Sequence, residues 1–151
     1  MNLDVTKNGV NIEAEGELMG RSRDYFELLQ EGSEPMTGWA RLPYGFDEDV
    51  LHEIELTAAR IREQCSLMIV VGIGGSYLGA KAVFDAMNGS RQDCPDLRFA
   101  GYNMSAAYLQ KMIKRMHEQA TCICVISKSG RTVEPSLTYS ILKEQMIAKY
   151  G

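Results

Sequence analysis

Three hydroxyl side chains lie close together in the segment Ser127-Lys128-Ser129-Gly130-Arg131-Thr132. Hydroxyl groups, free backbone amides and the amino terminus of a following helix all donate hydrogen bonds to phosphate oxygens. Thr132 is also placed to cap a helix, because Glu134 and Pro135 suit a first helical turn. A cap needs only one hydroxyl and this segment supplies three. We therefore predict that the segment binds phosphate through Ser127, Ser129 and Thr132, with Lys128 beside them.

A glycine-rich turn earlier in the chain has the composition of a second binding segment, Gly72-Ile73-Gly74-Gly75-Ser76-Tyr77-Leu78-Gly79. Glycines let the backbone approach a ligand closely and expose amide hydrogens, and Ser76 adds a hydroxyl where the next helix should begin. The alternative is a tight turn in which the serine only caps that helix. We predict that this turn forms a cradle for an anion or for sugar hydroxyls.

Two common nucleotide-binding patterns do not fit the glycine-rich turn. A dinucleotide fingerprint needs its third glycine where this chain has Tyr77, and no acidic residue is clearly placed about 20 positions further on. The Walker pattern fails as well, because no lysine followed by serine or threonine stands at the required spacing. We therefore predict that the chain uses no nicotinamide cofactor.

Both segments follow short apolar runs that we predict to be strands. The predicted strands cover 67–73, 97–102 and 121–127, and the predicted helices between and after them cover 78–87, 105–119 and 133–150. Strands that alternate with helices indicate an α/β fold with a parallel sheet flanked by helices. In such sheets the carboxyl ends of the strands share one edge, so the two segments could hold one ligand. In the helix 105–119, Met112 and Met116 belong to a stripe that we predict to be core.

The segment 1–65 is predicted to be mainly helical. A short helix should cover 21–30 and end near Gly32, and Asn8-Gly9 hints at a hairpin before it. From Asp47, the residues Val50, Ile54, Ala58, Ile61 and Cys65 recur at spacings of three or four. This is the period of a long amphipathic helix with one buried stripe. His52 and His117 fall among charged neighbours in helices, so we expect both at the surface rather than in a site.

Composition and charge narrow the possible partners. The chain has 151 residues, 45% of them hydrophobic, and a formal net charge of −4. The acidic balance argues against a nucleic-acid partner, since no basic stripe is available for a phosphate backbone. The longest apolar run is far short of the roughly 20 residues of a membrane span, so we expect no membrane partner and a cytoplasmic location. The four cysteines lack metal or redox spacing, so we expect reduced thiols and no metal.

The two turns together resemble the sugar-isomerase (SIS) domain, and closely resemble bacterial glucose-6-phosphate isomerases. The glycine-glycine-serine turn of that family is matched by Gly74, Gly75, Ser76, Leu78 and Gly79, and its phosphate loop by Ser127, Lys128, Ser129 and Thr132. Gly38-Trp39 and Leu42-Pro43 match the segment that precedes the long helix in the family. One departure is Arg131, where bacterial relatives usually carry threonine, and we expect its long side chain to point to solvent.

The resemblance implies a flavodoxin-like three-layer fold, with a helical lead-in segment at 1–65 and the first part of a SIS domain, truncated, at 66–151. It implies that Gly75 and Ser76 line the sugar-phosphate site and that Ser127, Ser129 and Thr132 hold the phosphate. In the family, the proton-transferring carboxylate, an arginine and the ring-opening histidine and lysine lie further along a much longer chain. We therefore expect no catalytic residue in this chain, and a homodimer for the parent enzyme.

Two functions remain open from the sequence. The first is the isomerisation of glucose 6-phosphate and fructose 6-phosphate, a step of glycolysis and gluconeogenesis, to which this chain would contribute the phosphate-binding part. The second is a stand-alone sugar-phosphate-binding module with a regulatory role, as SIS domains also form. Three strands are few for a parallel sheet, whose usual size is about five or six, and this favours the first function.

Overall fold

The computed structural model describes residues 15–32, 35–87 and 94–151. The chain divides into two compact units, one reaching to His52 and the other running from Glu53 to Gly151. The division falls inside a helix, whereas the sequence suggested a boundary at residue 65, where that helix ends. The functional boundary at residue 65 stays a prediction.

The first unit contains α1 (Glu15–Glu31) and a short 3-10 helix, η1 (Gly38–Arg41). The helix predicted at 21–30 is confirmed and begins earlier. It ends just before Gly32, whose φ of +64° favours glycine and whose amide donates to the carbonyls of Leu28 and Leu29. Arg41 Nε donates to Gln30 O over 2.8 Å and so ties η1 to the end of α1. The hairpin suggested by Asn8-Gly9 lies outside the described residues.

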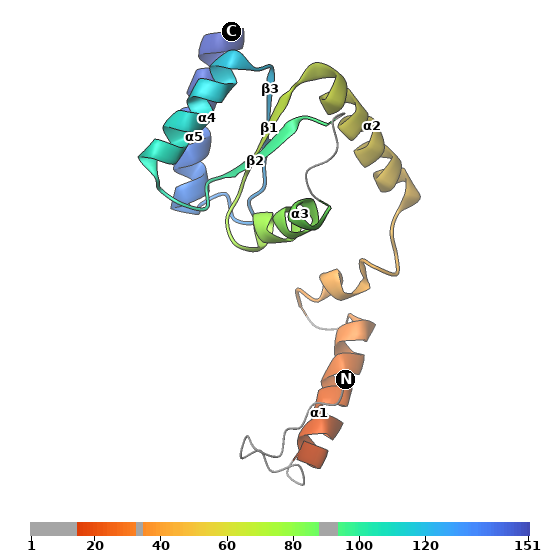
Figure 1. Ribbon diagram of the computed structural model, residues 1–151. Helices are drawn as coiled ribbons and strands as arrows, with labels where there is room; N and C mark the ends of the chain where they lie inside the picture. The colour runs from red at the N-terminus through yellow and green to blue at the C-terminus, as the bar shows by residue number, and fades with distance from the viewer. Residues whose placement is uncertain (1–14, 33–34, 88–93) are drawn as a thin grey trace. The chain divides into compact units, whose positions relative to one another are not determined.

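The second unit is built on a three-stranded parallel sheet in the order β2-β1-β3 (Figure 1). The strands are β1 (Leu67–Val71), β2 (Asp96–Ala100) and β3 (Thr121–Val125). Leu67 lies opposite Asp96 in β2 and Thr121 in β3, so all three strands begin together. The helices are α2 (Glu48–Gln64), α3 (Gly75–Ala86), α4 (Ala106–Glu118) and α5 (Val133–Tyr150). The predicted α/β fold is confirmed, and each strand leaves the ladder two residues earlier than predicted, to enter its turn.

The core lies on one face of β1, where Leu67, Ile69 and Val71 are completely buried. Met112 and Met116 from α4 and Leu142 from α5 pack against them. The predicted methionine stripe is therefore core. Phe99 of β2 lies on the opposite face, where its ring centroid is 6.1 Å from those of Tyr77 and Phe84, both in α3. Helices thus cover both faces of the sheet, which makes three layers.

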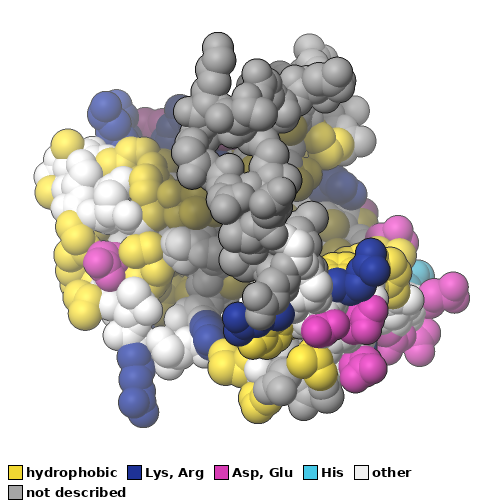
Figure 2. Space-filling view, turned by 90° about the horizontal axis from the view of Figure 1, so that it is seen from below, with side chains coloured by type: hydrophobic (Ala, Val, Ile, Leu, Met, Phe, Trp, Pro, Cys, Tyr) yellow, Lys and Arg dark blue, Asp and Glu magenta, His cyan; other side chains and the backbone are white. Residues whose placement is uncertain are grey.

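The predicted burial of one stripe of α2 is wrong for the first half of the helix, whereas Ala58 and Ile61 in the second half are half-buried. Val50 and Ile54 are 47% and 52% exposed, and within the described residues α2 contributes no buried side chain. Only Cys65, just after the helix, is buried. An amphipathic period identifies the apolar face of a helix, but that face is buried only where another part of the structure packs against it. On the face shown in Figure 2, hydrophobic side chains, drawn in yellow, are open to solvent beside charged ones.

The four cysteines are free thiols. Burial raises the pKa of the Cys65 and Cys124 thiols, which favours their protonated form. His52 and His117 are exposed, as predicted. Among the described residues, no helix is both long enough and apolar enough to cross a membrane.

The end of α5 holds the end of α4 through Lys149. Its Nζ donates to Met116 O over 2.5 Å and to Gln119 O over 2.6 Å, where α4 leaves carbonyls without intrahelical partners. Lys149→Met keeps most of the length of the side chain, which becomes one atom shorter, and removes both bonds. We expect the free energy of unfolding to fall by about 1–2 kcal/mol in urea denaturation. Lys143→Met, an exposed lysine in the same helix, is the matched control and should change stability by less than about 0.5 kcal/mol.

Candidate phosphate site

The predicted phosphate segment forms the loop between β3 and α5. Ile126 N donates to Val71 O over 2.9 Å, which anchors the start of the loop to β1. The loop residues from Ser127 to Arg131 are exposed, and Thr132 is half-buried at the residue before α5. Lys128 and Arg131 both project into solvent, as expected for Arg131. The loop therefore presents its hydroxyls and its charged side chains to the outside.

The serine hydroxyls also organise the loop. Ser127 Oγ accepts from Gly130 N over 2.9 Å, and Ser129 Oγ accepts from Arg131 N over 3.2 Å. Gly130 has a φ of +66°, and its carbonyl accepts from Ser136 Oγ in α5. A hydroxyl that accepts one bond still has its own proton to donate, so both serines can bind an anion. The amides of Gly130 and Arg131 are used inside the loop, so the expectation of free backbone amides is wrong at these two positions.

Thr132 occupies the cap position of α5, but its side chain makes no cap hydrogen bond. The capping role predicted for its hydroxyl is therefore wrong. A capping hydroxyl accepts from the second or third amide of a helix, and the third residue of α5 is Pro135, which has no N–H. The amides of Val133 and Glu134 have no intrahelical acceptor. The amino terminus of α5 is thus left uncapped by side chains, which suits an anion.

The glycine-rich turn leads from β1 into α3. Gly74 is the cap residue, with φ +57° and ψ −128°, a conformation that glycine adopts without a Cβ clash. Gly75 and Ser76 are the first residues of α3, so the alternative in which the serine caps the helix is wrong. Gly75 is exposed and Ser76 is half-buried.

The two turns lie side by side at the carboxyl ends of neighbouring strands. A Cβ on Gly72 would lie 3.2 Å from Ser76 Cβ and 3.3 Å from Ile126 O, so this glycine allows the turns to approach each other. The structure therefore brings Gly75 and Ser76 to the same edge of the sheet as the loop from Ser127 to Thr132. This edge combines hydroxyls, exposed glycine backbone and an uncapped helix terminus.

The structure has a cavity beside this edge that we did not predict from the sequence. It has a volume of about 180 Å³ and lies between the turn after β2 and the first turns of α5. None of the residues predicted to bind sugar phosphate lines it. The only sequence signal was a third strand-to-helix turn at 101–105, which lacks a run of glycines or hydroxyls. Its partner surface on α5 comes from a distant part of the chain, which the sequence does not reveal.

The fold is an α/β domain that carries two candidate binding turns at one edge of its parallel sheet. Residues 57–151 match the family description of phosphoglucose isomerase, so the chain belongs to the phosphoglucose isomerase family. It is 34% identical over 145 residues to the glucose-6-phosphate isomerases of Streptococcus pyogenes serotypes M3 and M1, across 89% of this chain and 32% of theirs. A crystal structure of a hypothetical protein from Thermus thermophilus aligns with a TM-score of 0.74 and 25% identity, covering 92% of this chain and 32% of that one. The chain thus spans about a third of the length of these relatives.

Proposed function

We propose that this chain provides the phosphate-binding part of an enzyme that interconverts glucose 6-phosphate and fructose 6-phosphate. The observation that carries the proposal is the pairing of two turns at one sheet edge beside the uncapped start of α5. Relatives at 34% identity bear the name of that enzyme, which favours isomerisation over a regulatory binding module. The enzyme would act in glycolysis and gluconeogenesis in the cytoplasm, as a homodimer.

The hydroxyls of Ser127, Ser129 and Thr132 would donate to the phosphate oxygens, and the amides of Val133 and Glu134 would add the positive end of the helix dipole. Lys128 is exposed in the same loop and would contribute charge rather than a fixed hydrogen bond.

On the neighbouring turn, Gly75 and Ser76 would meet the sugar. Isomerisation requires opening of the sugar ring and transfer of a proton between adjacent carbons through an enediol, which needs an acid and a base. We assign neither of these roles to a residue of this chain.

Titration of the 151-residue chain with phosphate, sulfate and fructose 6-phosphate tests the site, with amide chemical shifts as the readout. We expect shifts centred on 127–134 and 74–76. Ser129→Ala should weaken phosphate binding by about tenfold or more, because a hydrogen bond to a charged group contributes roughly 1.5–3 kcal/mol.

Ser140→Ala is the matched control, since its hydroxyl donates to Ser136 O within α5 over 3.0 Å, away from the loop. Its affinity for phosphate should equal that of the wild type. Shifts scattered over lysines elsewhere, and unchanged in Ser129→Ala, would refute the proposal.

A further inference from the structure

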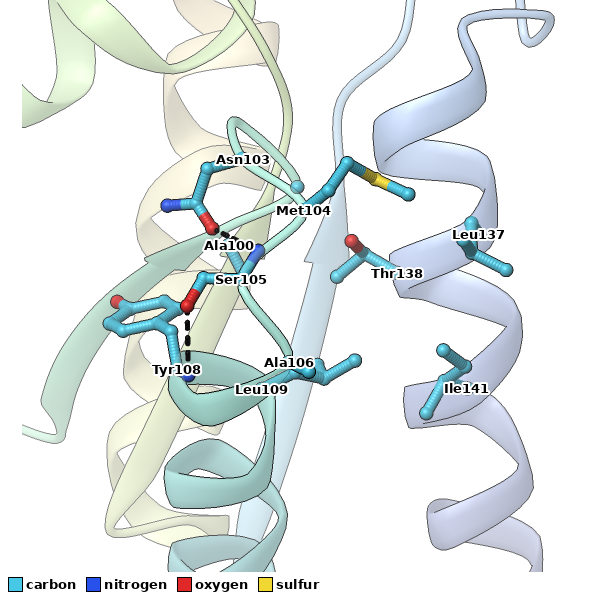
Figure 3. A pocket seen from close by; sticks show the side chains of 11 residues that line it. Ala100, Asn103, Met104, Ser105, Ala106, Tyr108, Leu109, Leu137, Thr138 and Ile141 are labelled. Carbon is cyan, nitrogen blue, oxygen red and sulfur yellow. Dashed lines mark hydrogen bonds between the residues drawn. The ribbon is translucent and has the colours of Figure 1, made fainter.

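The cavity between α4 and α5 has the size of a small-molecule site. Its volume is about 180 Å³, and an apolar cavity of about 150 Å³ in another protein holds benzene. Most of its lining is apolar, including Met104, Leu109 and Ile141, and Figure 3 shows these side chains between the two helices. A benzene-sized ring would therefore fit it and bury apolar surface.

The cavity contains no charged side chain. A buried charge without a partner is strongly unfavourable, so the chemistry of the lining selects a neutral ligand. Most polar groups of the lining already have partners. Ser105 Oγ accepts from Tyr108 N over 3.3 Å, and Asn103 Oδ1 accepts from Ser105 N over 3.0 Å, both at the start of α4.

Tyr108 is also occupied, because its hydroxyl donates to Phe99 O over 2.8 Å. Burial, followed by the neighbouring Tyr102, raises the pKa of Tyr108 to about 12, so this hydroxyl keeps its proton and its bond.

Thr138 differs from these residues. It is only 5% exposed, and among the described residues its hydroxyl has no hydrogen-bond partner. Ser140, in the same helix, bonds the carbonyl four residues earlier, but Thr138 does not. Figure 3 shows its oxygen directed into the space between α4 and α5, and no buried side-chain oxygen of the described residues is sealed off without a partner. A molecule that enters the cavity therefore meets this hydroxyl.

We propose that the cavity binds a small neutral molecule of the phenol class, an apolar ring with one hydroxyl that pairs with Thr138. The ring would fill the space lined by Leu109 and Ile141, and its hydroxyl would satisfy a threonine that is nine-tenths buried. The site is distinct from the phosphate site, since no residue of the loop 127–132 or of the turn 72–76 lines it.

Phenol and benzene, titrated separately into the 151-residue chain, test this site. Methyl and amide shifts are the readout, and we expect both probes to perturb Leu109, Leu137 and Ile141. Thr138→Val has nearly the same shape and lacks the hydroxyl. It should weaken phenol binding about threefold to tenfold, because a neutral hydrogen bond contributes roughly 0.5–1.5 kcal/mol, and it should leave benzene binding unchanged.

Ala106→Phe is the second variant, because Ala106 lies exposed at the start of α4 and a larger ring there would fill the cavity. It should abolish binding of both probes while shifts in β1 and β3 stay as in the wild type. The proposal is overturned if neither probe shifts the lining, or if Thr138→Val weakens phenol and benzene by the same factor. Equal phenol affinity in the wild type and Thr138→Val would equally overturn it.

Discussion

Fructose 6-phosphate is expected to remain unconverted by the 151-residue chain, although the chain should bind it. A phosphate cradle positions the substrate, but a base that moves the proton between carbons contributes a further factor of about 10²–10⁴, and orientation of that base more still. From the family resemblance, we expect the proton-transferring carboxylate to lie outside the part of the enzyme that this chain matches. Hours of observation by carbon NMR should therefore show no glucose 6-phosphate above the uncatalysed background.

Two variants make this expectation testable against its alternatives. The double variant Ser127→Ala with Ser129→Ala should lose sugar-phosphate binding, so any conversion that persists in it comes from a contaminating enzyme. Glu134 is the acidic residue in the first turn of α5, next to the loop. If the wild-type chain converts the substrate and Glu134→Gln does not, a base lies within this chain and our expectation is wrong.

The position of the loop from Ser127 to Thr132 could be predicted from the sequence because its features are local, whereas its binding of phosphate stays a prediction. Ser127, Ser129 and Thr132 follow a buried strand, and the start of α5 at Val133 is where the pattern placed it. Local chemistry also explains why the predicted capping role of Thr132 was wrong. A capping hydroxyl commonly accepts a hydrogen bond from the amide of the third helical residue, and that residue is Pro135, which has no N–H. This signal was present in the sequence, so the error was one of interpretation.

Features that depend on contacts between distant segments could not be predicted. The stripe of Val50 and Ile54 has the period of a buried face, yet it is open to solvent among the described residues. The cavity joins the turn after β2 to Thr138 in α5, and neither segment alone has a binding pattern. The periodicity of a sequence shows which face of a helix is apolar, whereas the burial of that face depends on which other segments pack against it.

Gly101 also takes part in a contact between distant segments. It follows the last residue of β2 and lies against the first turn of α5. Its φ is +84°, and a Cβ there would lie 3.0 Å from Val71 Cγ1 and 3.1 Å from Pro135 Cα. Pro135 is buried in the first turn of α5, so its backbone cannot move without moving that turn. Gly101→Ala therefore combines an unfavourable backbone conformation with a steric overlap.

We expect Gly101→Ala to lower the free energy of unfolding by about 2–5 kcal/mol, of which about 1–2 kcal/mol comes from the positive φ and about 1–3 kcal/mol from the overlap. Gly130→Ala separates the two causes, because Gly130 has a φ of +66° and a Cβ there would meet no atom within 4 Å. Its cost should be about 1–2 kcal/mol in the same urea denaturation. If the two variants lose equal stability, α5 shifts freely to admit the methyl group. If Gly101→Ala is the milder change, the close approach of the turn to Pro135 is not a constraint on the fold.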